Sequence, residues 1–419
     1  MKHLYFLLAI LVTTSIAQIV KSDEALLNIN EAVGLAIEND PMLASIAERR
    51  RAMQDISVAE GQLPDPRIKF ATANVPATSF DPNQEPMTQF QFGLSQRFPR
   101  GDTRRLRTTR ADAKADLASR QQAARLLATV LEVRQAWLEV SYWSQAAAIL
   151  REQKATLEDL VDVTQAHYGE GRGQQQDVLR AQLELGLLQD KLLETDRQLE
   201  NARATLARWV GVEHAARPVD FEAVMLTPIV DLGQLGRKIP DHPVIGIQDA
   251  EINIQNSEVG LARQAYKPEW GVDVTYGARA SDPLGRSRAD FVSVMVNLDV
   301  PLFTDKRQDK RLSAARRNEA ASRLERDEHV RQLQQMFATA SSDWQHTGER
   351  LTLYQSEILS DSTQTYDVTL EAYRNEVTSF ALVIRARLLE FDTQLKALRL
   401  STDHLKAQAR LLYLQGEEE

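Results

Sequence analysis

The stretch GQLPDPRIKFATANVP, from Gly61 to Pro76, decides the fold of this chain. Beyond its first prolines the residues alternate, with Ile68, Phe70 and Thr72 on one side and small or charged residues on the other. A similar stretch, RQAYKPEWGVDVTYG, occupies residues 263–277. A two-residue period with one apolar face is typical of a β-strand that is half buried or faces lipid. The sequence therefore predicts strands inside a chain whose other segments read as helix.

The two stretches belong to a unit that occurs twice. Several landmarks recur at a constant shift of 202 positions, and those near the end of the unit recur at a shift of 205. The pairs are Asp40-Pro41 with His242-Pro243, Pro66 with Pro268, Pro99 with Pro301, Tyr168 with Tyr373, and residues 177–181 with residues 382–386. Because a shared register over such a length indicates duplication, we interpret the chain as two copies of one unit.

Each copy is expected to hold a helix, two strands and a long helical hairpin, in that order. The fold class is therefore mainly α with a small β part. The predicted repeats span residues 23–220 and 221–419 and together form one protomer. The expected bounds are 28–62 and 243–266 for the first helices, about 67–74, 88–98, 269–277 and 291–300 for the strands, and about 102–210 and 304–415 for the hairpins.

Long segments without proline or glycine indicate the hairpin helices. One runs from residue 102 to residue 165, and at a rise of about 1.5 Å per residue it would be about 96 Å long. In the helix that returns, apolar or small residues recur about every 3.5 positions. They are Leu185, Leu188, Leu192, Thr195, Leu199, Ala202, Leu206 and Trp209. This spacing predicts long antiparallel coiled-coil hairpins.

The composition narrows the class of protein. The chain has 419 residues, no cysteine and a net charge of −9, which excludes disulfides and cysteine nucleophiles and gives no reason to expect a nucleic-acid partner. The N-terminus, MKHLYFLLAILVTTSIAQ, combines Lys2 with an apolar run and a small-x-small site at Ser15-Ile16-Ala17. We predict a secretory signal peptide over residues 1–17, with cleavage as late as residue 22 as the other option. No later stretch approaches about 20 apolar residues, the length of a spanning helix.

Four strands cannot close a barrel by themselves. An open edge in lipid leaves backbone N–H and C=O groups unpaired, and the smallest membrane barrels have about eight strands. If the apolar sides of these strands face lipid, several copies must join. We therefore expect a homotrimer whose transmembrane β-strands form one barrel of about 12 strands. The charged helices would then hang into the periplasm as an α-helical tunnel.

With these features the chain resembles the outer-membrane factor family, the trimeric channel-tunnels of the TolC type. The resemblance rests on the duplicated unit, the proline after each second strand, and a hairpin tip followed by Asp177-Val178-Leu179. The stretches GQLPDPRIKF and QFGLSQRFPRGDTRRLR are most similar to the CzcC-like heavy-metal efflux branch. The resemblance implies an outer-membrane channel of a Gram-negative bacterium. It would be the passive exit duct of a tripartite efflux system, with heavy-metal cations as its expected substrate.

The resemblance also implies partners and the residues that meet them. The partners are a periplasmic adaptor (a membrane fusion protein) and an inner-membrane pump of the resistance-nodulation-division type. The adaptor is expected to contact the two hairpin tips. The matching residues are Tyr168, Gly169, Gly171, Gly173, Tyr373, Arg374, Asn375, Val377 and Thr378. The glycines would also allow a positive φ in a tight turn, whether or not an adaptor binds.

Charged residues just past the tips narrow the tunnel in this family. Asp177, Arg180 and Arg385 occupy that region here, and they are the expected constriction. The second repeat has Leu382 where many members have an acid, which weakens the case for an acidic ring. Asp177 and Arg180 could instead form an i,i+3 pair on the helix surface, worth a few tenths of a kcal/mol.

Motifs for catalysis and cofactor binding do not occur in the sequence. It has no Gly-x-Ser-x-Gly, P-loop or Rossmann glycine pattern, so we expect neither an enzyme nor a cofactor. The histidines form no closely spaced pairs of the kind that hold a metal, and we predict no metal site. They are His3, His167, His214, His242, His329, His346 and His404. His167 lies at a tip and is expected to be solvated.

Two other functions stay open at this stage. The chain could be a channel for type I protein secretion or drug efflux, because a wide tube selects its cargo only loosely. It could also be a soluble periplasmic coiled-coil scaffold or adaptor. That alternative explains the coiled-coil spacing, but it does not explain four alternating segments joined by large polar loops.

Overall fold

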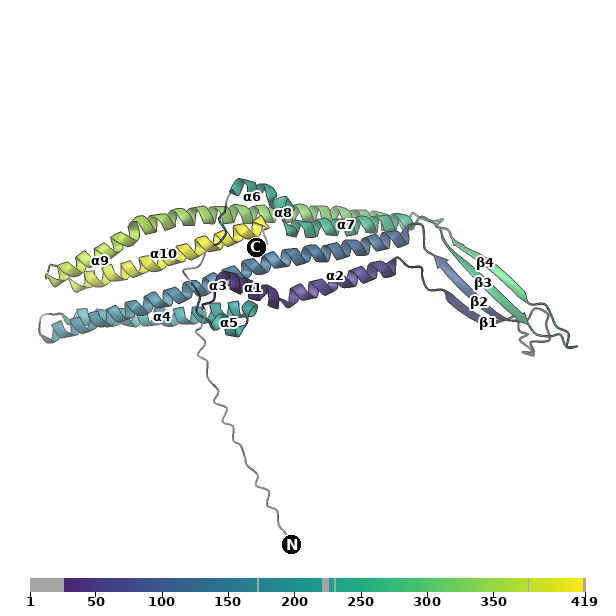
Figure 1. The fold of residues 1–419 in the computed structure, drawn as a ribbon, viewed down its shortest axis with the longest axis horizontal. Helices are drawn as coiled ribbons and strands as arrows, with labels where there is room; N and C mark the ends of the chain where they lie inside the picture. The colour runs from purple at the N-terminus through teal and green to yellow at the C-terminus, as the bar shows by residue number, and fades with distance from the viewer. Residues whose placement is uncertain (1–25, 172, 221–225, 230, 376, 417–419) are drawn as a thin grey trace, which may run out of the picture.

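The computed structural model describes residues 26–171, 173–220, 226–229, 231–375 and 377–416. The expected signal peptide lies outside these residues. The described chain is a long rod of helices with a small antiparallel sheet at one end (Figure 1). The prediction of a mainly helical protein with a small β part is confirmed. Within the described part, no helix has a stretch long and apolar enough to cross a membrane.

The elements follow one another along the rod as helices, paired strands and long helical hairpins. The strands are β1 (Arg67–Ala73), β2 (Gln89–Phe98), β3 (Glu269–Arg279) and β4 (Phe291–Asp299). The helices of the first half are α1 (Ile29–Asn39), α2 (Pro41–Glu60), α3 (Thr103–Gly169), α4 (Gln175–Val210) and α5 (Val212–Ala216). Those of the second half are α6 (Leu232–Lys238), η1 (Ile239–Asp241), α7 (Pro243–Gln264), α8 (Gln308–Leu353), η2 (Tyr354–Ile358), α9 (Leu359–Arg374) and α10 (Phe380–Gln415).

The first helix is broken where the sequence analysis expected it to be continuous. Asp40 lies between α1 and α2 with φ −76° and ψ 103°, an extended conformation. The residue before a proline is pushed out of the helical region by the proline ring, and Pro41 then begins a new helix. The side chain of Asp40 caps that helix by accepting a hydrogen bond from the backbone N–H of Met42 at 2.9 Å.

The second hairpin also differs from the regular helix that was expected. A π-helical turn, Tyr354–Ile358, separates α8 from α9. In Figure 1, α9 bends away from the line of α8. A π-helical turn is a recognised cause of such a bend, because it interrupts the regular i→i−4 hydrogen bonds.

Helix α3 is the spine of the molecule. It packs against α2 and α7 towards the sheet, and against α4 and α10 towards the opposite end (Figure 1). On α4, the buried residues Leu188, Thr195, Ala202 and Trp209 lie seven positions apart, as the coiled-coil spacing requires. Trp137 of α3 is fully buried in the largest core cluster, and its indole N–H donates to the carbonyl of Leu27 at 2.9 Å.

The sheet has the strand order β1-β2-β3-β4, with every neighbouring pair antiparallel. The register places Phe70, Phe92, Tyr276 and Val292 side by side across the four strands. Residues two positions away along each strand form the next row on the same face. One face of the sheet is therefore largely apolar, and the other carries most of the polar residues, with Phe291 and Met295 of β4 as apolar exceptions.

Candidate functional site

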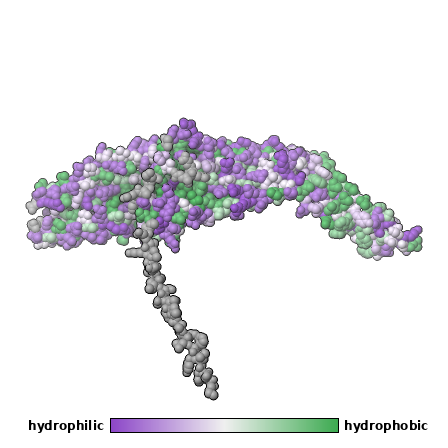
Figure 2. Space-filling model, in the orientation of Figure 1, coloured by the Kyte–Doolittle hydropathy of each residue, from purple (hydrophilic) through white to green (hydrophobic). Residues whose placement is uncertain are grey.

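The apolar face of the sheet is open to its surroundings. Phe70 is 79% exposed and Val292 is 71% exposed, and they are the two ends of an apolar row that crosses the sheet from β1 to β4. The next row is also apolar and exposed; it consists of Ile68, Leu94, Val274 and Val294. Figure 2 shows apolar surface gathered over the sheet, next to the mostly hydrophilic helices. A contiguous exposed patch of this kind marks a surface that another molecule or a membrane covers.

Both edges of the sheet are unpaired within the described chain. β1 pairs only with β2, and β4 pairs only with β3. Each edge strand therefore presents a row of backbone N–H and C=O groups without a β-partner. Such an edge can accept a strand from another chain, which is what the sequence analysis expected for this sheet.

The polar face carries an ionic network that crosses three strands. Lys69 of β1 donates to Asp273 of β3 at 2.5 Å, and Asn297 of β4 donates to the same carboxylate. The Lys69 side chain passes over Gly93 of β2, where an added Cβ would lie 3.0 Å from Thr275 Oγ1. The missing side chain of Gly93 makes room for the ion pair. The sequence analysis did not foresee this network.

The two loops beyond the sheet are joined by arginines. Arg288 donates to the carbonyls of Glu85 at 3.0 Å and Asn83 at 3.2 Å, and Arg279 donates to that of Pro86 at 3.2 Å. The loop between β3 and β4 therefore holds the loop between β1 and β2. The sequence offered no signal for this contact, because the acceptors are backbone carbonyls.

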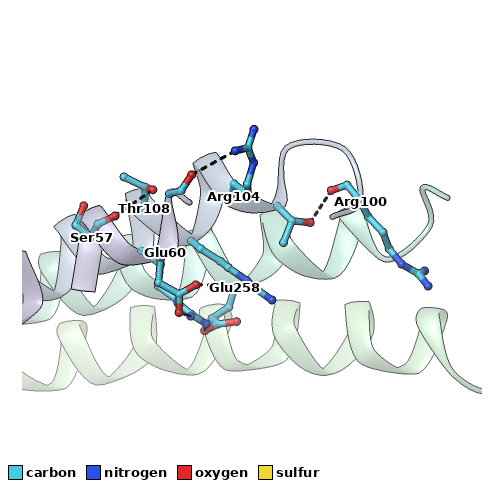
Figure 3. A network of polar contacts seen from close by, with 10 residues as sticks. Ser57, Glu60, Arg100, Arg104, Thr108 and Glu258 are labelled. Atoms are coloured by element: carbon cyan, nitrogen blue, oxygen red, sulfur yellow. Dashed lines mark hydrogen bonds and ion pairs between the residues drawn. The ribbon is translucent and has the colours of Figure 1, made fainter. Parts of the chain in front are cut away.

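A polar network ties three helices together just below the sheet (Figure 3). It joins α2, α3 and α7 through Arg110 with Glu258 at 2.8 Å, Thr108 with the Ser57 carbonyl at 3.4 Å, Arg104 with the Gly61 carbonyl at 3.4 Å, and Arg107 with Glu60 at 3.5 Å. These contacts hold α2, α3 and α7 side by side, in the same order as β1, β2 and β3, the strands to which these helices connect. The network therefore fixes the sheet relative to the rod.

The first hairpin tip is shaped by glycine. Gly171 has a φ of +75°, a region that favours glycine over other residues. The N–H of Gly173 donates to the carbonyl of His167 at 3.0 Å, and a Cβ on Gly173 would lie 3.0 Å from the backbone nitrogen of Tyr168. Gly169 has open space around it. The tip is thus a tight turn in which Gly171 and Gly173 each have a steric reason to be glycine.

The second tip presents a mixture of apolar and polar side chains. Arg374 forms an ion pair with Glu371 at 2.6 Å, and Asn375 donates to the Glu371 carbonyl at 2.8 Å. Val377 is exposed, as is Tyr168 of the first tip. Thr378 lies just before α10 and is partly buried. Both tips lie at the end of the rod opposite the sheet (Figure 1).

His167 and Tyr373 connect the two tips within one chain. The Tyr373 hydroxyl lies 3.3 Å from Nδ1 of His167. The centre of the Tyr373 ring lies 5.6 Å from the centre of the Phe380 ring. The expectation that His167 is simply solvated is therefore wrong, because the long hairpins end side by side. Burial raises the pKa of the Tyr373 hydroxyl, and the negative charge of Asp177 raises it further.

The three residues of the expected constriction do not form a cluster in the single chain. Asp177 lies in the first turn of α4 and acts electrostatically on Tyr373. Arg180 and Arg385 are exposed on α4 and α10. Among the ion pairs of the described residues, none joins Asp177 to Arg180 or to Arg385. A constriction made of these residues would require several copies of the chain.

A half-buried ionic cluster joins α3 to α10, and sequence analysis missed it. Glu139 of α3 contacts both Lys406 and Arg399 of α10, and Arg399 also contacts Asp403 at 3.1 Å. Burial alone would raise the pKa of Glu139, but the hydrogen bond from Lys406 and the two positive charges outweigh it, so the pKa lies below its ordinary value. The cluster clamps the two hairpins together near the middle of the rod.

The histidines have structural contacts of their own. His242 caps α7, and His404 lies 3.0 Å from the Trp344 carbonyl and 3.2 Å from the Thr347 hydroxyl. His3 lies outside the described residues. In the described ranges, no three His, Cys, Asp or Glu side chains come close enough together to hold a metal ion.

The sequence pattern of the outer membrane efflux proteins matches residues 32–212 and 242–417. The chain belongs to the outer membrane efflux protein family. As a member of this family it is an efflux channel of the Gram-negative outer membrane. Channels of this family are passive, so the chain is not an enzyme. They are trimers that work with an adaptor and an inner-membrane pump.

Solved structures of other outer membrane efflux proteins share the fold. A membrane protein from Pseudomonas aeruginosa superposes with a TM-score of 0.80 at 17% identity, over 92% of each chain. The CmeC outer membrane channel of Campylobacter jejuni superposes with a TM-score of 0.79 at 13% identity, over 93% of this chain and 85% of the CmeC chain. The open state of the Neisseria gonorrhoeae MtrE channel gives 0.74 at 15% identity, over 93% and 88%. Among curated proteins, none matches the sequence.

Proposed function

We propose that three copies of this chain form a passive exit duct across the outer membrane. The unpaired edges of β1 and β4 carry this proposal, because in lipid they must be paired by strands of neighbouring copies. Three sheets of four strands would close into a barrel with Phe70 and Val292 towards lipid and the Lys69–Asp273 pair towards a wet lumen. The two repeats, residues 23–220 and 221–419, would each supply two strands and one hairpin.

The helices would continue the duct as a tunnel in the periplasm. Apolar residues stay exposed along α4 and α10 towards the tips; they are Leu179, Leu183 and Leu187 on α4, and Leu382 and Leu389 on α10. Exposed leucines in a coiled-coil segment call for a further helix to cover them. In this proposal, the helices of neighbouring copies and of a periplasmic adaptor supply that cover.

The proposed partners are an adaptor and an inner-membrane pump of the resistance-nodulation-division type. Tyr168 and Val377 support contact with the adaptor, because they expose apolar surface at the two tips. The chain itself would supply no energy. The pump would select the substrate and drive transport, and the duct would carry it out.

Heavy-metal cations are the proposed substrate. Only the resemblance of GQLPDPRIKF and QFGLSQRFPRGDTRRLR to the heavy-metal branch supports this choice. In the structure these stretches form β1, β2 and the beginning of α3, far from the tips. Drug efflux and type I secretion remain the alternatives, because the same duct would serve any of these pumps.

Membrane fractionation tests the channel proposal. We expect the full-length protein in outer-membrane fractions, as a trimer that converts to monomer on heating in detergent. Purified trimers should produce stable conductance steps in planar bilayers. A monomer that stays in the soluble periplasmic fraction would instead favour the coiled-coil scaffold.

The substrate is tested in cells. Deletion of the gene should raise the accumulation of zinc, cobalt or cadmium, and the intact gene should restore normal levels. Accumulation of a fluorescent drug, measured in the same cells, should change little. If only the drug accumulates, or if only a secreted protein is retained, the corresponding alternative replaces the metal proposal.

A further inference from the structure

The end of β4 joins an exposed apolar segment to a cluster of positive charges. Val300 and Leu302 follow the end of β4 at Asp299, and both are exposed, Leu302 by 75%. Phe303 beside it is 86% exposed. The chain then enters α8 through four basic residues, which we name the basic collar. They are Lys306, Arg307, Lys310 and Arg311.

The basic collar carries charges that have no ionic partner in the described chain. All four side chains belong to exposed residues, and no ion pair between described residues involves any of them. Two acids lie among these residues, Asp305 and Asp309, so residues 305–311 carry four basic and two acidic side chains. Asp309 accepts a hydrogen bond from the Tyr266 hydroxyl at 2.6 Å, and Asp305 forms no ion pair with the collar among the described residues. The whole chain has a net charge of −9, so the collar is a local excess of positive charge on a protein that is negatively charged overall.

Three arginines near the beginning of α3, namely Arg100, Arg104 and Arg110, lie near the same end of the sheet but are used differently. Arg100 pairs with Glu269 at 3.5 Å, and Arg110 pairs with Glu258 at 2.8 Å. Arg104 donates to the Gly61 carbonyl (Figure 3). These side chains hold the beginning of α3 to its neighbours α2, α7 and β3. The basic collar has no such internal role, so its charge is available to an external partner.

We propose that the basic collar binds the headgroups of anionic phospholipids, while Leu302 and Phe303 insert among their acyl chains. Basic side chains next to an exposed apolar segment are the arrangement that recognises an anionic lipid surface. Phe303 lies in the chain between the apolar sheet and the first basic residue, Lys306, a position where aromatic residues mark a membrane interface. This inference rests on the proposed insertion of the sheet into the outer membrane.

The collar would set the depth of the channel in the membrane. β4 ends at Asp299, the exposed apolar residues Val300, Leu302 and Phe303 follow it, and the first basic residue is Lys306. A ring of three collars in the trimer would therefore lie at the level of the headgroups on the periplasmic side. Anionic lipid held there would oppose movement of the barrel along the membrane normal.

Lipid retention by the full-length trimer tests the proposal. The wild type and the variant K306Q/R307Q/K310Q/R311Q are reconstituted in nanodiscs that contain equal parts of phosphatidylcholine and phosphatidylglycerol. The phosphatidylglycerol that stays bound after detergent extraction is then measured by native mass spectrometry. We expect the variant to retain at least about fivefold less phosphatidylglycerol than the wild type. A loss of about fivefold corresponds to the contribution of about one basic residue near an anionic membrane surface. High salt should lower retention by the wild type in the same way.

Two further variants separate lipid binding from folding. K191Q/R197Q/R323Q/R331Q removes the same charge from exposed positions on α4 and α8, and it should retain lipid like the wild type. K306R/R307K/K310R/R311K keeps the charge of the collar and should also retain lipid. Equal retention of phosphatidylglycerol by the neutralised variant and the wild type would overturn the inference of a lipid site. It would not contradict the proposed channel function.

Two other outcomes would also overturn it. If the neutralised collar fails to form trimers even in pure phosphatidylcholine, the collar contacts a neighbouring copy rather than lipid. If the wild type does not enter the nanodiscs at all, the proposed channel function is wrong, and the proposed lipid site is wrong as well.

Discussion

Asp40 and His242 cap α2 and α7 in the same way. Each precedes a proline at the first helical position, and each accepts the backbone N–H two residues later. The Met42 nitrogen lies 2.9 Å from Asp40 Oδ1, and the Val244 nitrogen lies 3.3 Å from His242 Nδ1. Burial alone would raise the pKa of Asp40, but hydrogen bonds from Arg125 and its neighbours hold it below its ordinary value.

The His242 cap requires a neutral ring. Nδ1 must be free of a proton to accept from Val244, and Nε2 donates to the Tyr413 carbonyl at 3.0 Å. Burial lowers the pKa of His242 below its ordinary value of 6.5, although the bond to Tyr413 acts in the opposite direction. Because the unfolded chain takes up the proton more readily, the stabilisation is complete above pH 6.5 and is lost as the pH falls towards the folded pKa.

We therefore predict that the melting temperature of the purified protein falls between about pH 7 and about pH 5 through His242. In the His242→Asn variant, the amide oxygen can still cap α7 but cannot titrate, so this part of the fall should disappear. The His346→Asn variant is the control, because His346 is exposed and caps no helix. An unchanged pH dependence in His242→Asn would contradict the prediction.

The cluster around Glu139 should contribute to stability. Lys406 is only 12% exposed, and its substitution by Met leaves Glu139 with Arg399 as its sole described cation. We expect Lys406→Met to lower the free energy of unfolding by about 1–3 kcal/mol, the cost of leaving a partly buried charge under-satisfied. Thermal or urea denaturation in detergent measures this.

Lys191→Met is the matched control for the cluster. It breaks the pair between Lys191 and Asp392, in which both side chains are about half exposed. An exposed pair of this kind is worth at most about 1 kcal/mol. Equal losses in the two variants would show that the Glu139 cluster does not clamp the hairpins.

Opposite faces of β4 should respond differently to the same charge. Val294 lies on the apolar face, and the adjacent Ser293 lies on the polar face. We expect Val294→Arg to cost about 2–4 kcal/mol if it faces the middle of a bilayer, and Ser293→Arg to cost little. The amount of heat-modifiable trimer in outer-membrane fractions measures the difference. Similar trimer levels in both variants would argue against a lipid-facing apolar side.

Gly171 should matter for partner contact more than for assembly. A valine at its φ of +75° costs about 1–2 kcal/mol in backbone strain and distorts the tip. We expect Gly171→Val to reduce efflux from cells while trimers still form. Gly34→Ala, in open space on α1 and outside the tips, should leave efflux unchanged. Normal efflux in Gly171→Val cells would refute a role for this tip in adaptor contact.

Asp177 and Arg385 are the proposed gate residues. Both lie near the tips, and neither is held by an ion pair among the described residues. If they narrow the tunnel in the trimer, the double variant D177N/R385Q should raise the leak conductance of single channels in planar bilayers. Unchanged leak conductance would show that Asp177 and Arg385 do not form the gate. Arg180→Gln tests the third candidate in the same recordings.

Much of the fold could be predicted because its signals are local. The two-residue period of Ile68 and Phe70 indicated a strand and its apolar face, and the seven-residue spacing on α4 indicated a coiled coil. The break at Asp40 was missed although Pro41 signalled it. The π-helical turn at Tyr354–Ile358 was missed because no residue type marks such a turn.

The sequence by itself determined which segments are helices or strands and which sides of them are apolar. These properties depend on neighbours a few positions apart, and the spacing of side chains records them. Only the tertiary structure decided which distant residues meet: Lys69 with Asp273 over Gly93, Glu139 with Lys406, and His167 with Tyr373. Such contacts depend on how whole elements lie against one another, and a period along one element carries no information about its partner.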